Sequence, residues 1–128
     1  MLVEDNPADV TLLSEALASH QVETPMFVAH DGDEGIRILD AIDESCLPCP
    51  DLIVLDLNLP RKSGFAVLER VRASRKCSRK PVVVFSASDA EDDRDQARRL
   101  GASFYIRKPS TLKDLVSIGE VLKKILAG

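Results

Sequence analysis

The chain has 128 residues, of which 45% are hydrophobic and 30% are charged, and its formal net charge is −4. This composition is far from that of a disordered chain, and the length fits one domain, residues 1–128, with a core of its own. An acidic domain repels the phosphate backbone of nucleic acids, and no run of about 18 apolar residues offers a membrane span. We therefore expect no direct nucleic-acid partner and no membrane partner.

Short apolar runs alternate with longer stretches of helical periodicity along the whole sequence. The apolar runs predict strands at residues 1–3, 25–30, 51–57, 81–87 and 103–107. The periodic stretches predict a helix after each strand, near residues 7–19, 36–42, 65–71, 89–100 and 111–126. Asn6 before Pro7, and also Thr111, are suited to helix N-caps, and Gly101 is suited to a C-cap. Repeated strand–helix units predict an α/β fold, a doubly wound parallel sheet with helices on both faces.

Charged and hydroxyl side chains lie at the ends of the predicted strands, at the sheet edge where such folds bind ligands. They are Glu4, Asp5, Asp56, Ser86 and Lys108. Three converging carboxylates carry a charge of about −3, which Lys108 reduces to about −2, and a divalent cation would bring the sum to zero. Oxygen ligands in an open site suit Mg²⁺. The sequence thus predicts a water-rich Mg²⁺ site, in which Asp56 can act as a nucleophile toward phosphorus while Lys108 stabilises charge.

The cysteines are Cys46, Cys49 and Cys77, an odd number. Cys46 and Cys49 have Cys-x₂-Cys spacing, but a structural zinc site needs about four ligands and the sequence offers no second pair. The segment at the N-terminus does not resemble a signal peptide. We therefore predict reduced thiols in loops or in the core, and a cytoplasmic location.

Each of these residues also has a simpler interpretation. Asp56 can cap a strand end, Glu4 and Asp5 can favour a helix N-terminus through its dipole, Ser86 can be an ordinary hydroxyl, and Tyr105 can be an ordinary core aromatic. Only the combination of these residues at the same ends of several strands favours a functional site over the simpler roles.

Four segments, in this order, carry a resemblance to a known family: "LVEDN", "LIVLDLNLPRKSG", "VVVFSAS" and "GASFYIRKP". Together they resemble the receiver domain of bacterial two-component response regulators, the chemotaxis-type fold, over the full length of the chain. The resemblance implies a flavodoxin-like (βα)₅ sheet of five strands in the order 2-1-3-4-5. It also implies a signalling domain of a phosphorelay, with only self-phosphorylating and self-dephosphorylating chemistry, rather than a metabolic enzyme.

The same resemblance implies roles for the residues of the predicted site. Asp56 would accept a phosphoryl group from the phosphohistidine of a sensor histidine kinase or a histidine phosphotransfer protein. Asp56, Asp5 and the backbone carbonyl of Asn58 would bind Mg²⁺, and Glu4 would act through water. Lys108 would pair first with Asp56 and then with a phosphoryl oxygen.

A conformational switch is also implied. After phosphorylation Ser86 would move toward the phosphoryl group and Tyr105 would rotate inward, while a cis peptide bond before Pro109 would hold the loop that carries Lys108. The surface read by a downstream protein target would comprise the fourth helix, the fifth strand and the fifth helix. The thin apolar stripe of the fourth helix suits an element that can shift.

The segments "NPADV" and "DLNLPRKSG" look most like the stand-alone receivers that serve phytochrome-type kinases, which are often homodimers. Three features depart from the family pattern: Ser86 stands where threonine is commoner, Glu4 stands where aspartate is frequent, and the first strand is short. The short strand leaves room for a native chain that begins before Met1. The sequence names neither the cognate kinase nor the output partner, and it leaves open the phosphoryl lifetime, the oligomeric state and whether the chain is trimmed.

Two other classes of protein remain possible on these residues. A phosphohydrolase of the haloacid-dehalogenase type also uses an aspartyl nucleophile and Mg²⁺. That class requires a second aspartate two residues after the nucleophile, where this chain has Asn58. A phosphorylation-independent binding module on the same fold would not require the acids and the lysine together.

Overall fold

The sheet of the computed structural model, which describes residues 1–21, 26–109 and 111–127, has the predicted arrangement. It contains parallel strands in the order β2-β1-β3-β4-β5. The strands are β1 (Leu2–Val3), β2 (Val28–Ala29), β3 (Ile53–Leu55), β4 (Val82–Ser86) and β5 (Phe104–Arg107). The predicted fold class and strand order are therefore confirmed. The start of the second predicted strand, at Pro25, lies outside the described residues.

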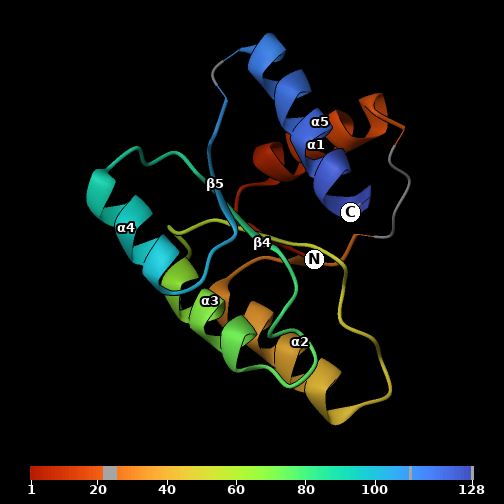
Figure 1. Ribbon diagram of the computed structural model, residues 1–128, viewed down its shortest axis with the longest axis vertical. Helices are drawn as coiled ribbons and strands as arrows, with labels where there is room; N and C mark the ends of the chain where they lie inside the picture. Colours follow the sequence, from red (N-terminus) through yellow and green to blue (C-terminus); the bar gives the residue numbers. More distant parts are fainter. Residues whose placement is uncertain (22–25, 110, 128) are drawn as a thin grey trace.

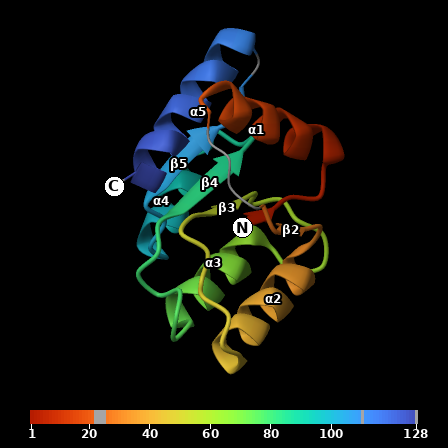
Figure 2. The same ribbon diagram turned by 90° about the vertical axis from the view of Figure 1, so that its right-hand side faces the viewer.

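Helices cover both faces of the sheet, which makes the molecule a three-layer sandwich (Figures 1 and 2). The helices are α1 (Pro7–Ser19), α2 (Gly32–Glu44), α3 (Gly64–Ala73), α4 (Glu91–Arg99) and α5 (Leu112–Ala127). Helices α1 and α5 pack together on one face, and α2 and α3 pack together on the other, with α4 beside α3. No helix of the described residues is both long and apolar enough to cross a membrane.

Alternation of side chains along the strands divides the core into two halves. Leu2 and Val54 point to the half under α1 and α5, whereas Val3, Ile53 and Leu55 point to the half under α2 and α3. Successive side chains of a strand face opposite sides of its sheet, so a continuous apolar run is buried on both faces. This is why the predicted central strands contain so few polar residues.

Local capping explains most helix boundaries. The side chain of Asn6 accepts a hydrogen bond from the backbone N–H of Ala8, as predicted for the start of α1. Helix α4 begins at Glu91, two residues later than predicted, and has no side-chain cap. Asp89 is not available as a cap, because its carboxylate pairs with Arg94 and Arg107. Gly101 follows the C-cap of α4 with a φ of 98°, a conformation that glycine adopts without strain.

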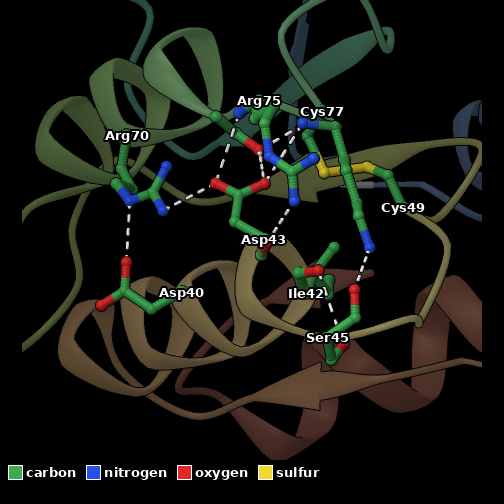
Figure 3. A network of polar contacts seen from close by, with 10 residues as sticks. Asp40, Ile42, Asp43, Ser45, Cys49, Arg70, Arg75 and Cys77 are labelled. Atoms are coloured by element: carbon green, nitrogen blue, oxygen red, sulfur yellow. Dashed lines mark hydrogen bonds and ion pairs between the residues drawn. A yellow bond between two sulfur atoms is a disulfide. The ribbon is translucent and has the colours of Figure 1, made fainter.

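A polar network joins the C-terminal end of α2 to the C-terminal end of α3 (Figure 3). The carboxylate of Asp43 accepts hydrogen bonds from the guanidinium of Arg70 at 2.8 Å and from Ser74 Oγ at 2.7 Å. It also accepts from the backbone N–H groups of Arg75 and Lys76. The hydrogen bonds from Ser74 and Arg70 hold the pKa of Asp43 well below its usual range. This carboxylate therefore stays ionised and fastens two helix ends together.

A disulfide bond lies next to this network and corrects the prediction of reduced thiols. Cys49 in the loop before β3 is bonded to Cys77 in the segment before β4 (Figure 3). Cys46 is free and exposed. The Cα atoms of the pair are 5.5 Å apart, within the range a disulfide requires. The prediction was wrong because the fold brings together two cysteines that are 28 residues apart, a proximity that the Cys-x₂-Cys spacing does not indicate.

We expect reduction of the Cys49–Cys77 bond to destabilise the domain without unfolding it. A cross-link that closes a loop of 28 residues restricts the unfolded chain, and its loss costs about 3 to 4 kcal/mol of unfolding free energy. The Asp43 network would still hold the end of α2 against the end of α3 and the residues that follow it. Urea denaturation with and without a thiol reductant measures the difference, and Cys46→Ala is the matched control that should leave it unchanged. Identical stability in both conditions would contradict this expectation.

Candidate functional site

Strand register brings two acidic side chains together at the carboxyl edge of the sheet. Val3 of β1 pairs with Leu55 of β3, so Glu4 and Asp56 are the next residues on adjacent strands. The backbone N–H of Asp56 also donates to the carbonyl of Val3 at 3.1 Å. Both carboxylates are buried, with 2% exposure at Glu4 and 4% at Asp56. The sequence prediction that these residues meet agrees with this geometry.

Lys108 reaches the same place from β5. Its backbone N–H donates to the carbonyl of Ser86 at 2.8 Å, which continues the pairing of β4 with β5 by one residue. Its Nζ lies 2.7 Å from Asp9 Oδ2, 3.0 Å from Asp56 Oδ2 and 3.1 Å from Glu4 Oε2. One ammonium group is thus shared among three carboxylates.

Burial and charge alter the protonation of this cluster. Burial, reinforced by the nearby charge of Asp56, raises the pKa of Glu4 to about 7, although the hydrogen bond from Lys108 acts in the opposite direction. Burial alone would lower the pKa of Lys108, but hydrogen bonds to Asp9 and Asp56 raise it above its usual value. Lys108 is therefore a permanent cation here, and Glu4 is the group whose charge responds to neutral pH.

The oxygen atoms of this edge fit a divalent cation. One carboxylate oxygen each from Glu4, Asp5 and Asp56 lies within 4.8 Å of the other two. Asp5 is exposed, so the cluster is open to solvent on one side, as a cation that keeps several waters requires. An all-oxygen donor set with excess negative charge suits Mg²⁺ or Mn²⁺ better than a softer metal.

The segment after Asp56 turns tightly around the site. The backbone N–H of Asn58 donates to Asp56 Oδ1 at 3.2 Å, and the N–H of Gly64 donates to the carbonyl of Leu57 at 2.9 Å. A Cβ atom at Gly64 would lie 2.1 Å from the carbonyl oxygen of Asp56. Glycine is therefore required there for the backbone to approach so closely. Asn58 is next to the site, while its carbonyl as a metal ligand remains a prediction.

Ser86 and Tyr105 are connected through one residue, Ser88. Ser86 is fully buried at the end of β4, and its Oγ accepts a hydrogen bond from the N–H of Ser88 at 3.2 Å. The hydroxyl of half-buried Tyr105 donates to the carbonyl of Ser88 at 2.9 Å. The guanidinium of Arg94 lies 4.5 Å from the centre of the Tyr105 ring. A movement of Ser86 would thus reach Tyr105 through a short backbone segment.

The peptide bond between Lys108 and Pro109 is trans, since the described residues contain no cis peptide bond. The predicted cis bond is therefore wrong for this structure. The trans form is favoured by about 0.5–1 kcal/mol for a bond before proline, and Lys108 reaches the carboxylates without the cis isomer.

Sequence reasoning missed Asp9, which makes the shortest contact to Lys108. Asp9 lies in the first turn of α1, the helix that begins just after Glu4 and Asp5. Its place one helical turn after Asp5 was the available signal, because the first turn of that helix faces the same edge of the sheet.

Comparison with known proteins agrees with this geometry. A family profile described as the response regulator receiver domain matches residues 1–120. The chain belongs to the response regulator receiver domain family. As a receiver domain it is a signalling domain of two-component systems rather than a classical enzyme.

Individual relatives are similar over most of the receiver domain. The response regulator Rcp1 of Synechocystis is 37% identical over 116 residues, which cover 90% of this chain and 79% of Rcp1. The transcriptional regulatory protein TrcR of Mycobacterium tuberculosis is also 37% identical, but the match covers 91% of this chain and only 42% of TrcR. The receiver domain thus spans less than half of that longer regulator.

Solved structures give the same result. The phosphorylated cyanobacterial phytochrome response regulator RcpA superposes with a TM-score of 0.86 at 37% identity, covering 99% of this chain and 91% of that one. The Mn²⁺-bound form of Rcp1 superposes with a TM-score of 0.79 at 32% identity, covering 96% and 89%.

We expect the affinity of this site for Mg²⁺ to fall as the pH falls through 7. Below its pKa of about 7 Glu4 carries a proton that competes with the cation, so the dissociation constant should rise about tenfold between pH 8 and pH 6. Calorimetric titration with Mg²⁺ at the two pH values measures this change. Glu4→Gln should remove most of the pH dependence of the dissociation constant. A dissociation constant of the wild-type protein that is the same at both pH values would contradict the proposed role of Glu4.

The same shift predicts how stability depends on pH in the absence of metal. The folded-state pKa of Glu4 lies above its unfolded value of 4.5, so its stabilising contribution is fully present below about pH 4.5 and is lost as the pH rises through 7. Mg²⁺ should therefore raise the thermal midpoint more at pH 8 than at pH 5. An equal increase at both values would count against the role of Glu4.

Proposed function

We propose that this receiver domain accepts a phosphoryl group on Asp56, with Mg²⁺ as cofactor, and that the modification switches its conformation. The observation that carries the proposal is the position of the Asp56 carboxylate at the end of a buried strand. It lies 3.0 Å from the Lys108 ammonium and shares a cation-sized cluster of oxygens with Glu4 and Asp5. This arrangement fixes a nucleophile next to groups that neutralise the charge of a phosphoryl donor.

The transfer needs little from the protein besides position and charge. An oxygen of Asp56 forms a bond to phosphorus as the bond from phosphorus to the donor nitrogen of a phosphohistidine breaks. The electron pair of the broken bond stays on the imidazole, which takes a proton from solvent. Lys108 pairs with an equatorial phosphoryl oxygen, and the rigid end of β3 holds Asp56 in line. Bound Mg²⁺ would supply the remaining positive charge through Asp5, Asp56 and the carbonyl of Asn58, with Glu4 acting through water.

The geometry favours this function over the two alternatives. A hydrolase of the haloacid-dehalogenase type needs a second carboxylate two residues after the nucleophile to protonate its leaving group. Asn58 occupies that position and its side chain is exposed. A phosphorylation-independent binding module gains nothing from burying Glu4 and Asp56 side by side, an arrangement that costs free energy without a cation.

The proposed donor is a sensor histidine kinase or a histidine phosphotransfer protein. A phytochrome-type kinase is the specific candidate, because RcpA, which is 37% identical, is a phytochrome response regulator. The proposed location is the cytoplasm. The Cys49–Cys77 disulfide is unusual for that compartment, so the thiol state of the protein isolated from cells is an informative measurement.

The proposed switch passes from Ser86 to Tyr105. A phosphoryl group on Asp56 would offer the Ser86 hydroxyl a charged acceptor, and hydrogen bonds to charged groups are about twice as strong as neutral ones. In the present structure Ser86 Oγ accepts a hydrogen bond from the N–H of Ser88. Moving Ser86 would release the N–H of Ser88, whose carbonyl holds the Tyr105 hydroxyl. Phosphorylation would then shift the balance between two packings of the segment between β4 and α4.

The proposed output surface lies on α4, β5 and α5. Exposed apolar side chains there include Phe104 on β5 and Val116 and Val121 on α5, with exposures of 47%, 46% and 38%. Only Ala97 of α4 is buried, so little apolar contact area fixes that helix. A downstream protein target would bind this surface, and it is also the proposed contact of a homodimer.

Phosphorylation of Asp56 can be tested with a small-molecule donor. We expect acetyl phosphate and Mg²⁺ to give one phosphoryl adduct by intact-mass analysis, absent in Asp56→Ala because the nucleophile is missing. Asp51→Ala is the matched control. It removes an exposed carboxylate two residues before β3, at the end of that strand opposite to Asp56, and should leave the adduct unchanged. A wild-type protein that gains no adduct, or an adduct that persists in Asp56→Ala, would contradict the proposal.

The switch can be followed with intrinsic fluorescence, because Tyr105 is the single tyrosine and the chain has no tryptophan. Beryllofluoride with Mg²⁺ mimics the phosphoryl group and should change the Tyr105 emission in the wild-type protein. In Ser86→Ala we expect this change to fall several-fold while the acetyl phosphate adduct still forms. An emission change of the same size in both proteins would show that Ser86 does not transmit the signal.

A further inference from the structure

Asp9 differs from the other partners of Lys108. Its Oδ2 lies 2.7 Å from Lys108 Nζ, closer than the oxygens of Asp56 at 3.0 Å and Glu4 at 3.1 Å. It belongs to α1, whereas Glu4 and Asp56 follow strands. It is also outside the group of Glu4, Asp5 and Asp56 whose oxygens can share one cation. Asp9 is therefore the partner of Lys108 that a bound cation leaves free.

Cation binding creates a problem for Lys108 that Asp9 can solve. An ammonium group has three N–H donors, and in this structure it faces three carboxylates. A divalent cation would draw an oxygen of Asp56 toward itself, would engage Glu4 through water, and would bring its own positive charge close to Lys108. The side chain of Lys108 is only 16% exposed, so solvent replaces lost partners poorly. A buried ammonium without a partner is costly, and this cost would oppose cation binding.

We propose that Asp9 is a positioning residue that retains Lys108 in the cleft when a divalent cation occupies the carboxylates of Glu4, Asp5 and Asp56. The inference deepens the proposed function and rests on it for its biological meaning. Asp9 keeps one hydrogen bond and one opposite charge on Lys108 throughout. The freed N–H groups then point toward Asp56, where a phosphoryl oxygen would arrive. Cation and lysine can in this way occupy the same small site together.

Asp9 has a simpler role that the test must separate. It is the third residue of α1, where an acidic side chain stabilises a helix through its dipole. Asp114 is the third residue of α5 and its side chain is exposed, so Asp114→Ala removes the same kind of charge from the same helical position away from the site. Any effect common to Asp9→Ala and Asp114→Ala reports the helix dipole alone.

The test is a double-mutant cycle on cation affinity. Mn²⁺ is titrated, with electron paramagnetic resonance detecting free ion, into the wild-type protein, Asp9→Ala, Lys108→Ala and the double variant. We expect Asp9→Ala to weaken Mn²⁺ binding about tenfold in the wild-type background and less than about twofold in the Lys108→Ala background, because the effect passes through Lys108. Asp9→Asn keeps an acceptor of the same shape and should lie between wild type and Asp9→Ala. Asp114→Ala should bind Mn²⁺ like the wild-type protein.

Equal weakening by Asp9→Ala in both backgrounds would overturn the inference, since it would show a through-space effect of charge independent of Lys108. Unchanged affinity in Asp9→Ala would overturn it as well. Thermal denaturation confirms that each variant is folded, and Asp9→Asn replaces Asp9→Ala in the cycle if the alanine variant is not. Failure of the proposed function would appear in the acetyl phosphate experiment, as a wild-type protein that gains no phosphoryl adduct. The Mn²⁺ double-mutant cycle would still decide the role of Asp9 in that case.

Discussion

The sharing of one ammonium group among buried carboxylates is the interaction on which the rest of this structure depends. Glu4 and Asp56 lie side by side because Val3 pairs with Leu55, and neither carboxylate is exposed by more than 4%. Two adjacent buried negative charges would destabilise the fold, so Lys108 must be present and must be charged. The raised pKa of Glu4 shows that one lysine compensates only part of this cost. A divalent cation would supply the positive charge that this arrangement still lacks.

The two edges of the sheet carry different kinds of interaction. At the edge where β3 and β4 begin, the Cys49–Cys77 bond and the ionised Asp43 fasten loops and helix ends together. At the edge where the same strands end, the chain carries the Asp56 carboxylate, the proposed phosphoryl acceptor, and the Ser86–Ser88–Tyr105 connection. In the proposed switch, a rigid first edge would let a small change at the second edge reach other elements. Helix α4, which buries only Ala97, is the element best placed to respond.

Short-range patterns in the sequence were sufficient to predict a parallel sheet of strand–helix units and the meeting of Glu4, Asp56 and Lys108 at one edge of it. The strand order 2-1-3-4-5 came instead from the resemblance to receiver domains. Continuous apolar runs identify strands buried on two faces, and residues at the carboxyl ends of parallel strands must meet. The pairing of Cys49 with Cys77 depends instead on how separate elements dock, and no local spacing encodes it. The spacing of Asp9 from Asp5 indicated only that Asp9 faces the same edge of the sheet, and not that it contacts Lys108. The late start of α4 has a similar cause, since Asp89, where the helix was predicted to begin, forms an ion pair with Arg107 of β5. The trans bond before Pro109 was missed because the resemblance suggested a cis bond that the loop does not need.

The central claim is that Asp56 is a nucleophile in a divalent-cation site shared with Lys108. A crystal structure grown with Mn²⁺ and beryllofluoride tests it most directly, because anomalous scattering locates the metal independently of the surrounding atoms. We expect one metal ion with Asp5 and Asp56 among its ligands at about 2.0–2.2 Å, and beryllium bonded to an oxygen of Asp56 with a fluoride facing Lys108. Metal bound elsewhere, or beryllofluoride absent from Asp56 while the metal is present, would contradict it.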